Sequence, residues 1–271
     1  MKDKRILYVS SEVVPYLPET ELASTAFNVA KNAHSKGVQT RIFMPRFGVI
    51  NERRHQLHEV IRLSGVNLII NDMDMPLIIK VASIPKERMQ VYFIDNDEYF
   101  KRKAIITDED DNLFEDNDER AIFFAKGVVE TVKKLNWAPD VIHIHGWLAS
   151  LLPLYLREYY KEEPLFTESK IVTSIYNDKF EGELGKNMSE KIKYDKIDDK
   201  KIATIAKPNH LNILKSAVEN SDAIIYGSET ISEDLSAFIE KQDMPVLEFQ
   251  ADNLKEPYLE FYSSLLGIEE N

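Results

Sequence analysis

The chain has 271 residues, 44% of them apolar, which is enough for a large hydrophobic core and excludes a disordered or collagen-like protein. Its 46 acidic and 34 basic residues give a net charge of −12, which disfavours binding to nucleic acids and to anionic membranes. The sequence has no cysteine, which excludes disulfides and thiolate metal sites, and no apolar stretch that approaches the ~18 residues of a membrane span, so we expect a cytoplasmic protein.

The first elements follow a strand, helix, strand order. A β-branched and aromatic run predicts a strand over 5–10, and helical spacing predicts a helix over 22–36 that ends at Gly37. Strand character returns over 38–44. Units of this kind build parallel sheets.

Three closely spaced apolar runs follow, at 61–70, 77–84 and 90–94. The spacing leaves no room for crossover helices between them, so it predicts an antiparallel β insertion over about 60–95. The next segment, 101–118, is rich in aspartate and glutamate but lacks the glycine and ligand spacing of a calcium-binding loop. We expect it to be a solvated loop.

The second half of the chain again alternates strands with helices. Helices are predicted over 119–135, 147–160, 210–220 and 230–240, strands over 139–146, 170–176, 223–227 and 245–249, and a terminal helix over about 256–266. No repeat or glycine-serine linker divides the chain, so residues 1–271 are expected to form one α/β domain, a doubly wound parallel sheet with a β insertion and no second domain. The terminal helix is expected to cover an exposed side of that sheet.

Ligands of doubly wound sheets bind beyond the carboxyl ends of the strands, where the loop 11–21 follows the first strand. This loop contains no glycine, unlike a phosphate cradle. Glu19 and Glu21 complement the positive end of the helix dipole and would repel a pyrophosphate. We therefore interpret the segment as a helix start with Thr20 as its N-cap, and we expect no cofactor.

His143 and His145 lie two residues apart on a predicted strand and so share one face at its carboxyl end. A metal pair is conceivable, but spacing indicates no third ligand. We expect neutral histidines in the core or at its rim, and no metal site.

Five short segments follow one another along the chain in a distinctive order and spacing. They are Ile6-Leu7-Tyr8-Val9-Ser10-Ser11-Glu12 with Pro15, Pro45-Arg46-Phe47-Gly48, Asp116-Asn117 with Arg120, Pro139 to Trp147, and Ser221 to Glu229. In order and spacing they resemble the N-terminal, acceptor-side domain of bacterial glycogen synthases and plant starch synthases. The resemblance implies a Rossmann-like domain of the GT-B type. It also implies a family chemistry in which glucose passes, with retention, from ADP-glucose or UDP-glucose to an α-1,4-glucan.

The sequence departs from this family at the positions expected to be catalytic. The family loop Lys-Thr-Gly-Gly-Leu-Ala falls on residues 18–23, where Pro18 replaces the lysine and Thr20 and Glu21 replace the glycines. Gly146 stands for the aspartate of His-Asp-Trp, and Tyr176 for the histidine of Thr-x-His-Asn. No catalytic residue is therefore assigned, and the chain is expected to be inactive by itself.

The resemblance leaves an acceptor face as the expected function, in a protein that binds α-glucan or maltooligosaccharide or acts as a regulatory derivative. The candidate sugar-binding residues are Tyr16, Asp116, Asn117, His143, His145, Trp147 and Asn177. The alternative is the acceptor subunit of a split glucosyltransferase, in which a protein partner supplies the donor-binding domain. A self-sufficient glucosyltransferase is disfavoured by the replaced loop.

Overall fold

The computed structural model describes residues 1–251 and 256–268. Its strands are β1 (Arg5–Ser10), β2 (Gln39–Pro45), β3 (His58–Glu59), β4 (Val66–Ile70), β5 (Met73–Ser83), β6 (Gln90–Asp95), β7 (Val141–His145), β8 (Lys170–Ile175), β9 (Ala223–Tyr226) and β10 (Val246–Leu247). The α-helices are α1 (Glu21–Ser35), α2 (Glu52–His55), α3 (Asp97–Phe100), α4 (Asn117–Leu135), α5 (Leu152–Glu158), α6 (Met188–Lys193), α7 (His210–Glu219), α8 (Glu233–Ile239) and α9 (Glu256–Leu265). Short 3-10 helices, η1 (Trp147–Ala149), η2 (Pro164–Phe166), η3 (Asp199–Lys201) and η4 (Ala203–Ala206), join some of these elements.

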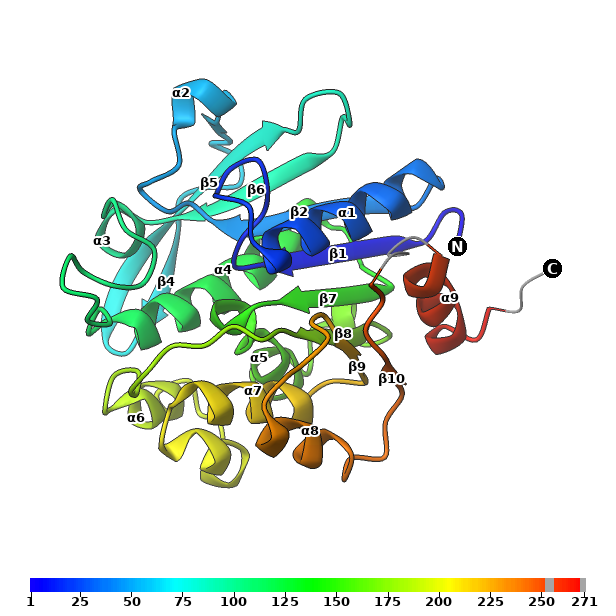
Figure 1. Ribbon diagram of the computed structural model, residues 1–271. Helices are drawn as coiled ribbons and strands as arrows, with labels where there is room; N and C mark the ends of the chain where they lie inside the picture. Colours follow the sequence, from blue (N-terminus) through cyan, green and yellow to red (C-terminus); the bar gives the residue numbers. More distant parts are fainter. Residues whose placement is uncertain (252–255, 269–271) are drawn as a thin grey trace.

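The strands form a mixed sheet in the order β10-β9-β8-β7-β1-β2-β6-β5-β3, with β4 paired to β5. From β10 to β6 all neighbours run parallel, and β5 pairs antiparallel with β6, β3 and β4. Helices cover both faces of the sheet (Figure 1). The expected α/β class, a mainly parallel doubly wound sheet with a β insertion, is confirmed.

Local signals in the sequence placed the first helix correctly. Thr20 has an extended backbone and its hydroxyl accepts a hydrogen bond from the Ala23 amide, as an N-cap does. Gly37 follows the helix with a φ of +85°, the left-handed conformation that favours glycine after a helix end.

Two predicted elements need correction. The strand expected over 61–70 begins only at Val66, because the residues before it form a turn in which Leu63 and Ser64 donate to the Val60 carbonyl. Within the insertion, β6 is antiparallel to β5 but parallel to β2, so the hairpin returns the chain to the main sheet.

The helix expected over 147–160 is also interrupted. It consists of the 3-10 turn η1 followed by α5, in which Pro153 occupies the first turn. Proline lacks an amide hydrogen, is tolerated at a helix start and breaks a helix interior, so the two segments do not merge.

The centre of the sheet is covered by the helix α9 near the end of the chain. Tyr258 and Tyr262 of α9 are buried, and the Tyr262 hydroxyl lies 2.6 Å from Nδ1 of His143 on β7. His143 pairs in register with Tyr8 on β1. The terminal helix expected over 256–266 is therefore present, and it packs over the two central strands.

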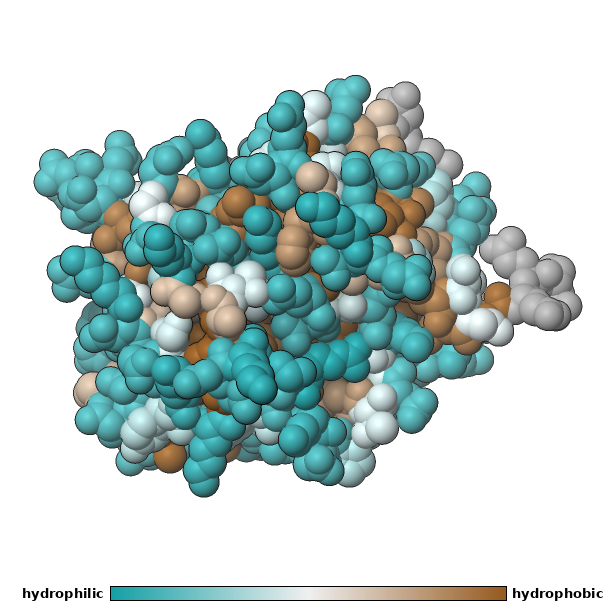
Figure 2. Space-filling model, turned by 90° about the horizontal axis from the view of Figure 1, so that it is seen from below, coloured by the Kyte–Doolittle hydropathy of each residue, from teal (hydrophilic) through white to brown (hydrophobic). Residues whose placement is uncertain are grey.

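The surface is largely polar. Figure 2 shows a mainly hydrophilic face on which hydrophobic side chains form small separate groups. Within residues 1–251 and 256–268, no helix has the length and apolar character needed to cross a bilayer.

Candidate functional site

The carboxyl ends of β1, β7, β8 and β9 lie side by side. Ser10 of β1 pairs with His145 of β7, His145 with Ser174 of β8, and Ile175 of β8 with Tyr226 of β9. The loops that leave these ends therefore form one continuous edge, where open α/β sheets bind ligands. This strand-end edge contains the replaced family positions.

The start of α1 is tied to the loop after β9 at this edge. The Ser228 hydroxyl donates a hydrogen bond to the Glu21 carboxylate and accepts one, 2.9 Å long, from the backbone N–H of Asn177. The Thr20 hydroxyl donates to the Glu12 carboxylate at 2.8 Å. Where the family loop has a lysine and two glycines, this chain has a network of carboxylates, hydroxyls and one amide.

The edge is acidic. Burial raises the pKa of Glu12, and the nearby Asp178 carboxylate raises it further, against the lowering effect of the Thr20 hydrogen bond. Among the described residues no lysine or arginine forms an ion pair with Glu12, Glu19 or Glu21. The arrangement does not offer the fixed positive charge that a diphosphate needs.

Gly146 takes a conformation that a side chain would disturb. Its φ is +83°, and an added Cβ would lie 2.6 Å from Ser11 Oγ and 2.8 Å from Leu22 Cδ1. Ser11 lies in the loop after β1, and Leu22 lies in the first turn of α1. Glycine therefore fits at position 146 and aspartate does not, because the backbone conformation and the surrounding atoms both leave no room for a side chain.

Tyr176 fills a position next to a second glycine. Its hydroxyl lies 2.7 Å from Nδ1 of His145, and a Cβ on Gly227 would approach its ring to 2.5 Å. Burial raises the pKa of Tyr176 well above its ordinary value. Tyr176 is a neutral buried residue, and its hydroxyl is already hydrogen-bonded to His145.

The two histidines are neutral and enclosed. Their ring centroids are 3.9 Å apart, and His143 Nε2 lies 2.7 Å from Ser174 Oγ while its Nδ1 meets Tyr262. Burial lowers the pKa of both, that of His145 to about 3, and the pKa of His143 is lowered further by His145. In the described parts of the chain, no three or more His, Asp or Glu side chains are grouped as a metal site.

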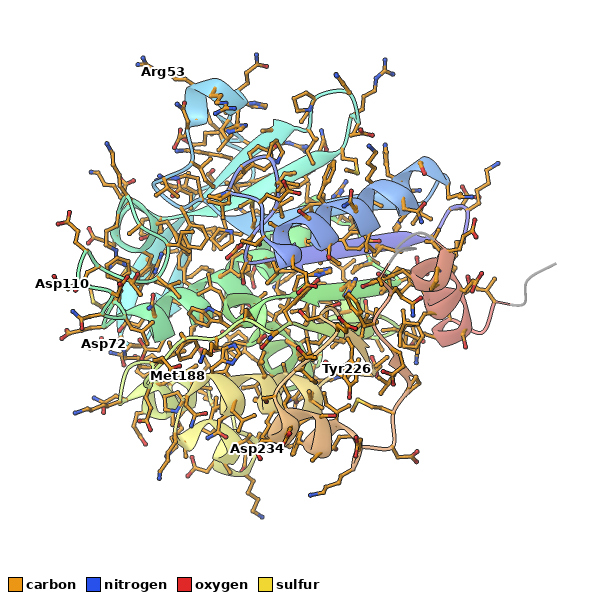
Figure 3. All side chains as sticks on the ribbon, viewed as in Figure 1. Arg53, Asp72, Asp110, Met188, Tyr226 and Asp234 are labelled. Carbon is orange, nitrogen blue, oxygen red and sulfur yellow. The ribbon has the colours of Figure 1, made fainter. Side chains whose placement is uncertain are left out.

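Asp116 and Asn117 organise the acidic loop. Asn117 is fully buried, donates to the Ile106 carbonyl at 2.8 Å and accepts from Arg120 at 2.6 Å. Asp116 accepts a hydrogen bond from Arg102 at 2.7 Å. The loop itself is open to solvent, with Asp110 at the periphery in Figure 3.

The structure separates the remaining candidates. Tyr16 packs its ring 4.9 Å from that of Phe93 on β6 and 5.0 Å from His55, so it belongs to the outer half of the sheet. Trp147 is buried, with its ring 4.9 Å from that of Phe180. In the described conformation a ligand in solvent does not reach Asn117, His143 or His145, because all three are completely buried.

Asn177 is exposed and lines a hollow of about 380 Å³ at the strand-end edge. We call this hollow the Asn177 groove. It lies between the loop after β8 and the starts of α7 and α8, with Asp234 of α8 labelled in Figure 3. Its other polar and aromatic lining side chains include Asp178, Phe180, Asn209, His210 and Ser232.

Several of these groove residues were not predicted from the sequence. His210 stands with Phe180 in an edge-to-face contact, and its Nε2 is 3.5 Å from Asp178 Oδ1 without a hydrogen bond to any described group. One indication of a site here was present in the sequence: the irregular polar stretch after 170–176 begins at the end of a predicted strand. Nothing local indicated that the start of α7 meets this stretch.

Comparisons with known proteins agree with this architecture. Residues 5–244 match the family model described as the starch synthase catalytic domain. A glycogen synthase of Chlorobium luteolum is 34% identical over 86% of this chain and 47% of its own length, and one of Chlorobaculum tepidum is 32% identical over 98% and 53%.

A solved structure has the same fold. The catalytic domain of Starch Synthase IV from Arabidopsis thaliana, bound to ADP and acarbose, superposes with a TM-score of 0.71 at 16% identity, over 91% of this chain and 52% of that one. The chain therefore spans about half the length of the relatives that it matches.

Proposed function

Because the chain belongs to the starch synthase catalytic-domain family, we propose that it binds α-glucan through the Asn177 groove and does not transfer glucose by itself. The relatives named glycogen synthase motivate the choice of an α-glucan. The two parts of the proposal rest on different features of the strand-end edge.

Glucan binding is supported by the chemistry of the groove. Sugars present hydroxyl groups around an apolar ring face, and sites for them combine a few fixed polar groups with aromatic surface. The groove brings the exposed Asn177 amide and the Asp178 carboxylate next to Phe180 and His210. His210 Nε2 has no hydrogen bond to a described group and lies 3.5 Å from Asp178 Oδ1, so it is the polar group of the lining that is not yet used.

The absence of transfer is supported by the charge at the start of α1. A departing nucleoside diphosphate must be stabilised by cations or by preorganised donors. Here Glu21 occupies a family glycine position, and its carboxylate accepts a hydrogen bond from Ser228. This contact is the single observation that carries the proposal, because it fixes a negative charge where the family loop has no side chain.

The test is calorimetry of the purified chain with maltoheptaose, ADP-glucose and UDP-glucose, with a β-1,4-linked oligosaccharide as the control ligand. We expect saturable binding of maltoheptaose alone. Incorporation of glucose into glucan by the pure chain would refute the inactive half of the proposal. Binding of either nucleotide-sugar would refute the argument that the charge at the start of α1 excludes a diphosphate. No binding of maltoheptaose would refute the other half.

A split enzyme is the second candidate, motivated by the match to about half of each relative. In that case a partner supplies the donor-binding domain and docks on the strand-end edge. Such an obligate interface would bury about 2,000 Å² or more. Co-elution with a donor-domain protein, together with glucose transfer only in the mixture, would support it; separate elution and no transfer would exclude it.

A further inference from the structure

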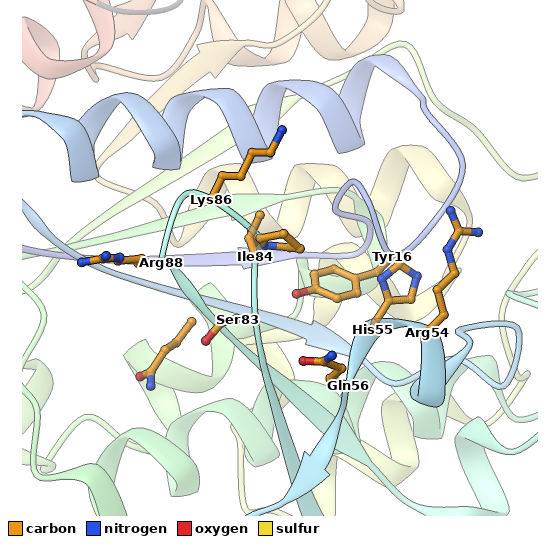
Figure 4. Close-up of a pocket in the computed structure, with 10 residues that line it drawn as sticks. Tyr16, Arg54, His55, Gln56, Ser83, Ile84, Lys86 and Arg88 are labelled. Atoms are coloured by element: carbon orange, nitrogen blue, oxygen red, sulfur yellow. The ribbon is translucent and has the colours of Figure 1, made fainter.

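A second hollow, of about 550 Å³, lies on the outer half of the sheet, away from the strand ends of β8 and β9. We call it the basic groove. Figure 4 shows its two walls, with Lys86 and Arg88 on the β5–β6 connection on one side and Tyr16, Arg54 and His55 on the other. It shares no lining residue with the Asn177 groove.

The basic groove concentrates positive charge in an acidic protein. Arg54, Lys86 and Arg88 line it, and no aspartate or glutamate does, although the chain carries a net charge of −12. None of the three cations forms an ion pair or a side-chain hydrogen bond with another residue in the described part of the chain. Glu87, which lies between two of them in sequence, is paired instead with Lys31 at 2.7 Å.

A buried hydroxyl lies beside the same hollow. Tyr16 is only 5% exposed, and its Oη has no hydrogen-bond partner among the described residues. Figure 4 shows this oxygen directed toward the β5–β6 wall. A buried polar group without a partner is costly, and such groups in native proteins generally have a functional or solvent partner.

The backbone around the groove is held in an uncommon conformation. Gln56, Lys86 and Arg88 all have positive φ values, of 55°, 71° and 57°. Gln56 is the left-handed C-cap of α2, and Lys86 and Arg88 lie in the turn that connects β5 to β6. A helix cap and a tight turn therefore set the course of the backbone on the two walls of the groove.

The positive surface continues past Arg88. A neighbouring hollow of about 390 Å³ shares Arg88 and Gln90 and adds Arg41, which stacks 4.6 Å from the Trp137 ring centroid. Nη1 of Arg41 is buried and has no hydrogen-bond partner among the described residues. Together the two hollows are lined by four cationic side chains, those of Arg41, Arg54, Lys86 and Arg88.

We propose that the basic groove binds a small ligand that carries a phosphate monoester or a diphosphate group. Arg54, Lys86 and Arg88 balance the phosphate charge, and guanidinium groups suit phosphate because they donate two parallel hydrogen bonds to it. The Tyr16 hydroxyl donates to an oxygen of the ligand. The site is separate from the Asn177 groove, so a failure to bind glucan would not contradict this proposal.

The test is calorimetry at low ionic strength with inorganic phosphate, inorganic pyrophosphate and a hexose monophosphate. We expect saturable binding of at least one of them and a large loss of affinity at high salt, since exposed charges are screened. Tighter binding of pyrophosphate than of phosphate assigns a diphosphate ligand, and tighter binding of the hexose phosphate assigns a phosphorylated sugar. No saturable binding of any of the three overturns the proposal.

Variants locate the site. R54Q/K86Q/R88Q should raise the dissociation constant at least tenfold, and Tyr16→Phe, which removes only the buried hydroxyl, should raise it about threefold. The matched control K186Q/K200Q/K241Q removes the same charge from exposed lysines outside the groove and should change it less than twofold. Equal weakening by both triple variants would show a general charge effect and reject the site. If the groove triple variant does not fold, Arg88→Gln alone serves, and it should raise the dissociation constant about threefold.

Discussion

Residues from neighbouring family motifs lie in two regions with opposite exposure. His143 and His145 are completely buried, and His143 contacts Tyr262 of α9. Asn177, which follows the neighbouring strand β8, is exposed and lines a groove. The comparison teaches that likeness to a family motif does not by itself indicate contact with ligand. The enclosed residues stabilise the sheet, and the open ones remain available for binding.

The largest expected effect is on the enclosed region. Tyr262→Ala should lower the free energy of unfolding by about 3 to 5 kcal/mol, because it removes a fully buried aromatic ring and leaves His143 Nδ1 without its partner. Urea denaturation measures this change. Tyr194→Ala is the control, since Tyr194 is 54% exposed and should cost less than about 0.5 kcal/mol. Similar losses in both variants would contradict the enclosed role of α9.

The enclosed histidines should make stability depend on pH. Their pKa values in the folded protein lie below the ordinary 6.5, so the unfolded chain takes up protons first as pH falls, and folding stability is lost in that direction. From pH 7.5 to 5.5 each should lower the free energy of unfolding by about 1.4 kcal/mol.

Variants separate these histidines from other titrating groups. Denaturation curves of His145→Gln should show a pH dependence smaller by about the contribution of one histidine. His58→Gln, at an exposed position, should keep the dependence of the unmodified protein. A slope that neither substitution changes would assign the pH effect to carboxylates instead.

Restoring the family aspartate at position 146, between the two regions, should destabilise the protein without restoring activity. Gly146→Asp is expected to cost about 2 to 3 kcal/mol, since it combines a left-handed backbone with contacts below 3 Å to Ser11 and Leu22. It should also produce no glucose transfer in an assay with ADP-glucose and maltoheptaose. Gly146→Ala should show a similar cost, because the strain arises at Cβ. A neutral Gly146→Asp variant that gains activity would reverse our reading of this position.

The smallest expected effect is in the open region. Asn177→Ala should weaken maltoheptaose binding by about 3- to 10-fold, the value of one or two hydrogen bonds, and change stability by less than about 0.5 kcal/mol. Calorimetry and urea denaturation measure the two quantities. Asn187→Ala is the matched control, since Asn187 is exposed, makes no capping bond and does not line the groove. Unchanged affinity in Asn177→Ala would move the glucan site elsewhere.

Local chemistry explains which parts of the fold were predictable. The Thr20 cap and the glycine after α1 depend on a few neighbouring residues, and both were placed correctly. The broken helix at 147–160 was missed although Pro153 marks it, because the apolar spacing continues through the break. The strand at 61–70 was placed too early for the same reason, since apolar residues in a turn resemble those in a strand.

The candidate site was only partly predictable. Asn177 follows a strand end, so its place at the edge could be inferred from the sequence. Tyr16 also follows a strand end, yet its loop turns toward β6 and places it in the basic groove with Arg54 and Lys86. No periodicity or motif brings together these three residues, which come from separate elements.

By itself, the sequence determined the α/β class, the family, and the loss of the lysine and glycines at the start of α1, because these depend on residue types and on spacing along the chain. Only the tertiary structure decided that His143 is covered by Tyr262, that Glu21 is joined to Ser228, and that one hollow is lined by three cations without an ion pair among the described residues. The reason is that burial and charge pairing are set by contacts between residues far apart in sequence. Those contacts form only when the sheet brings its strand ends and connecting loops together.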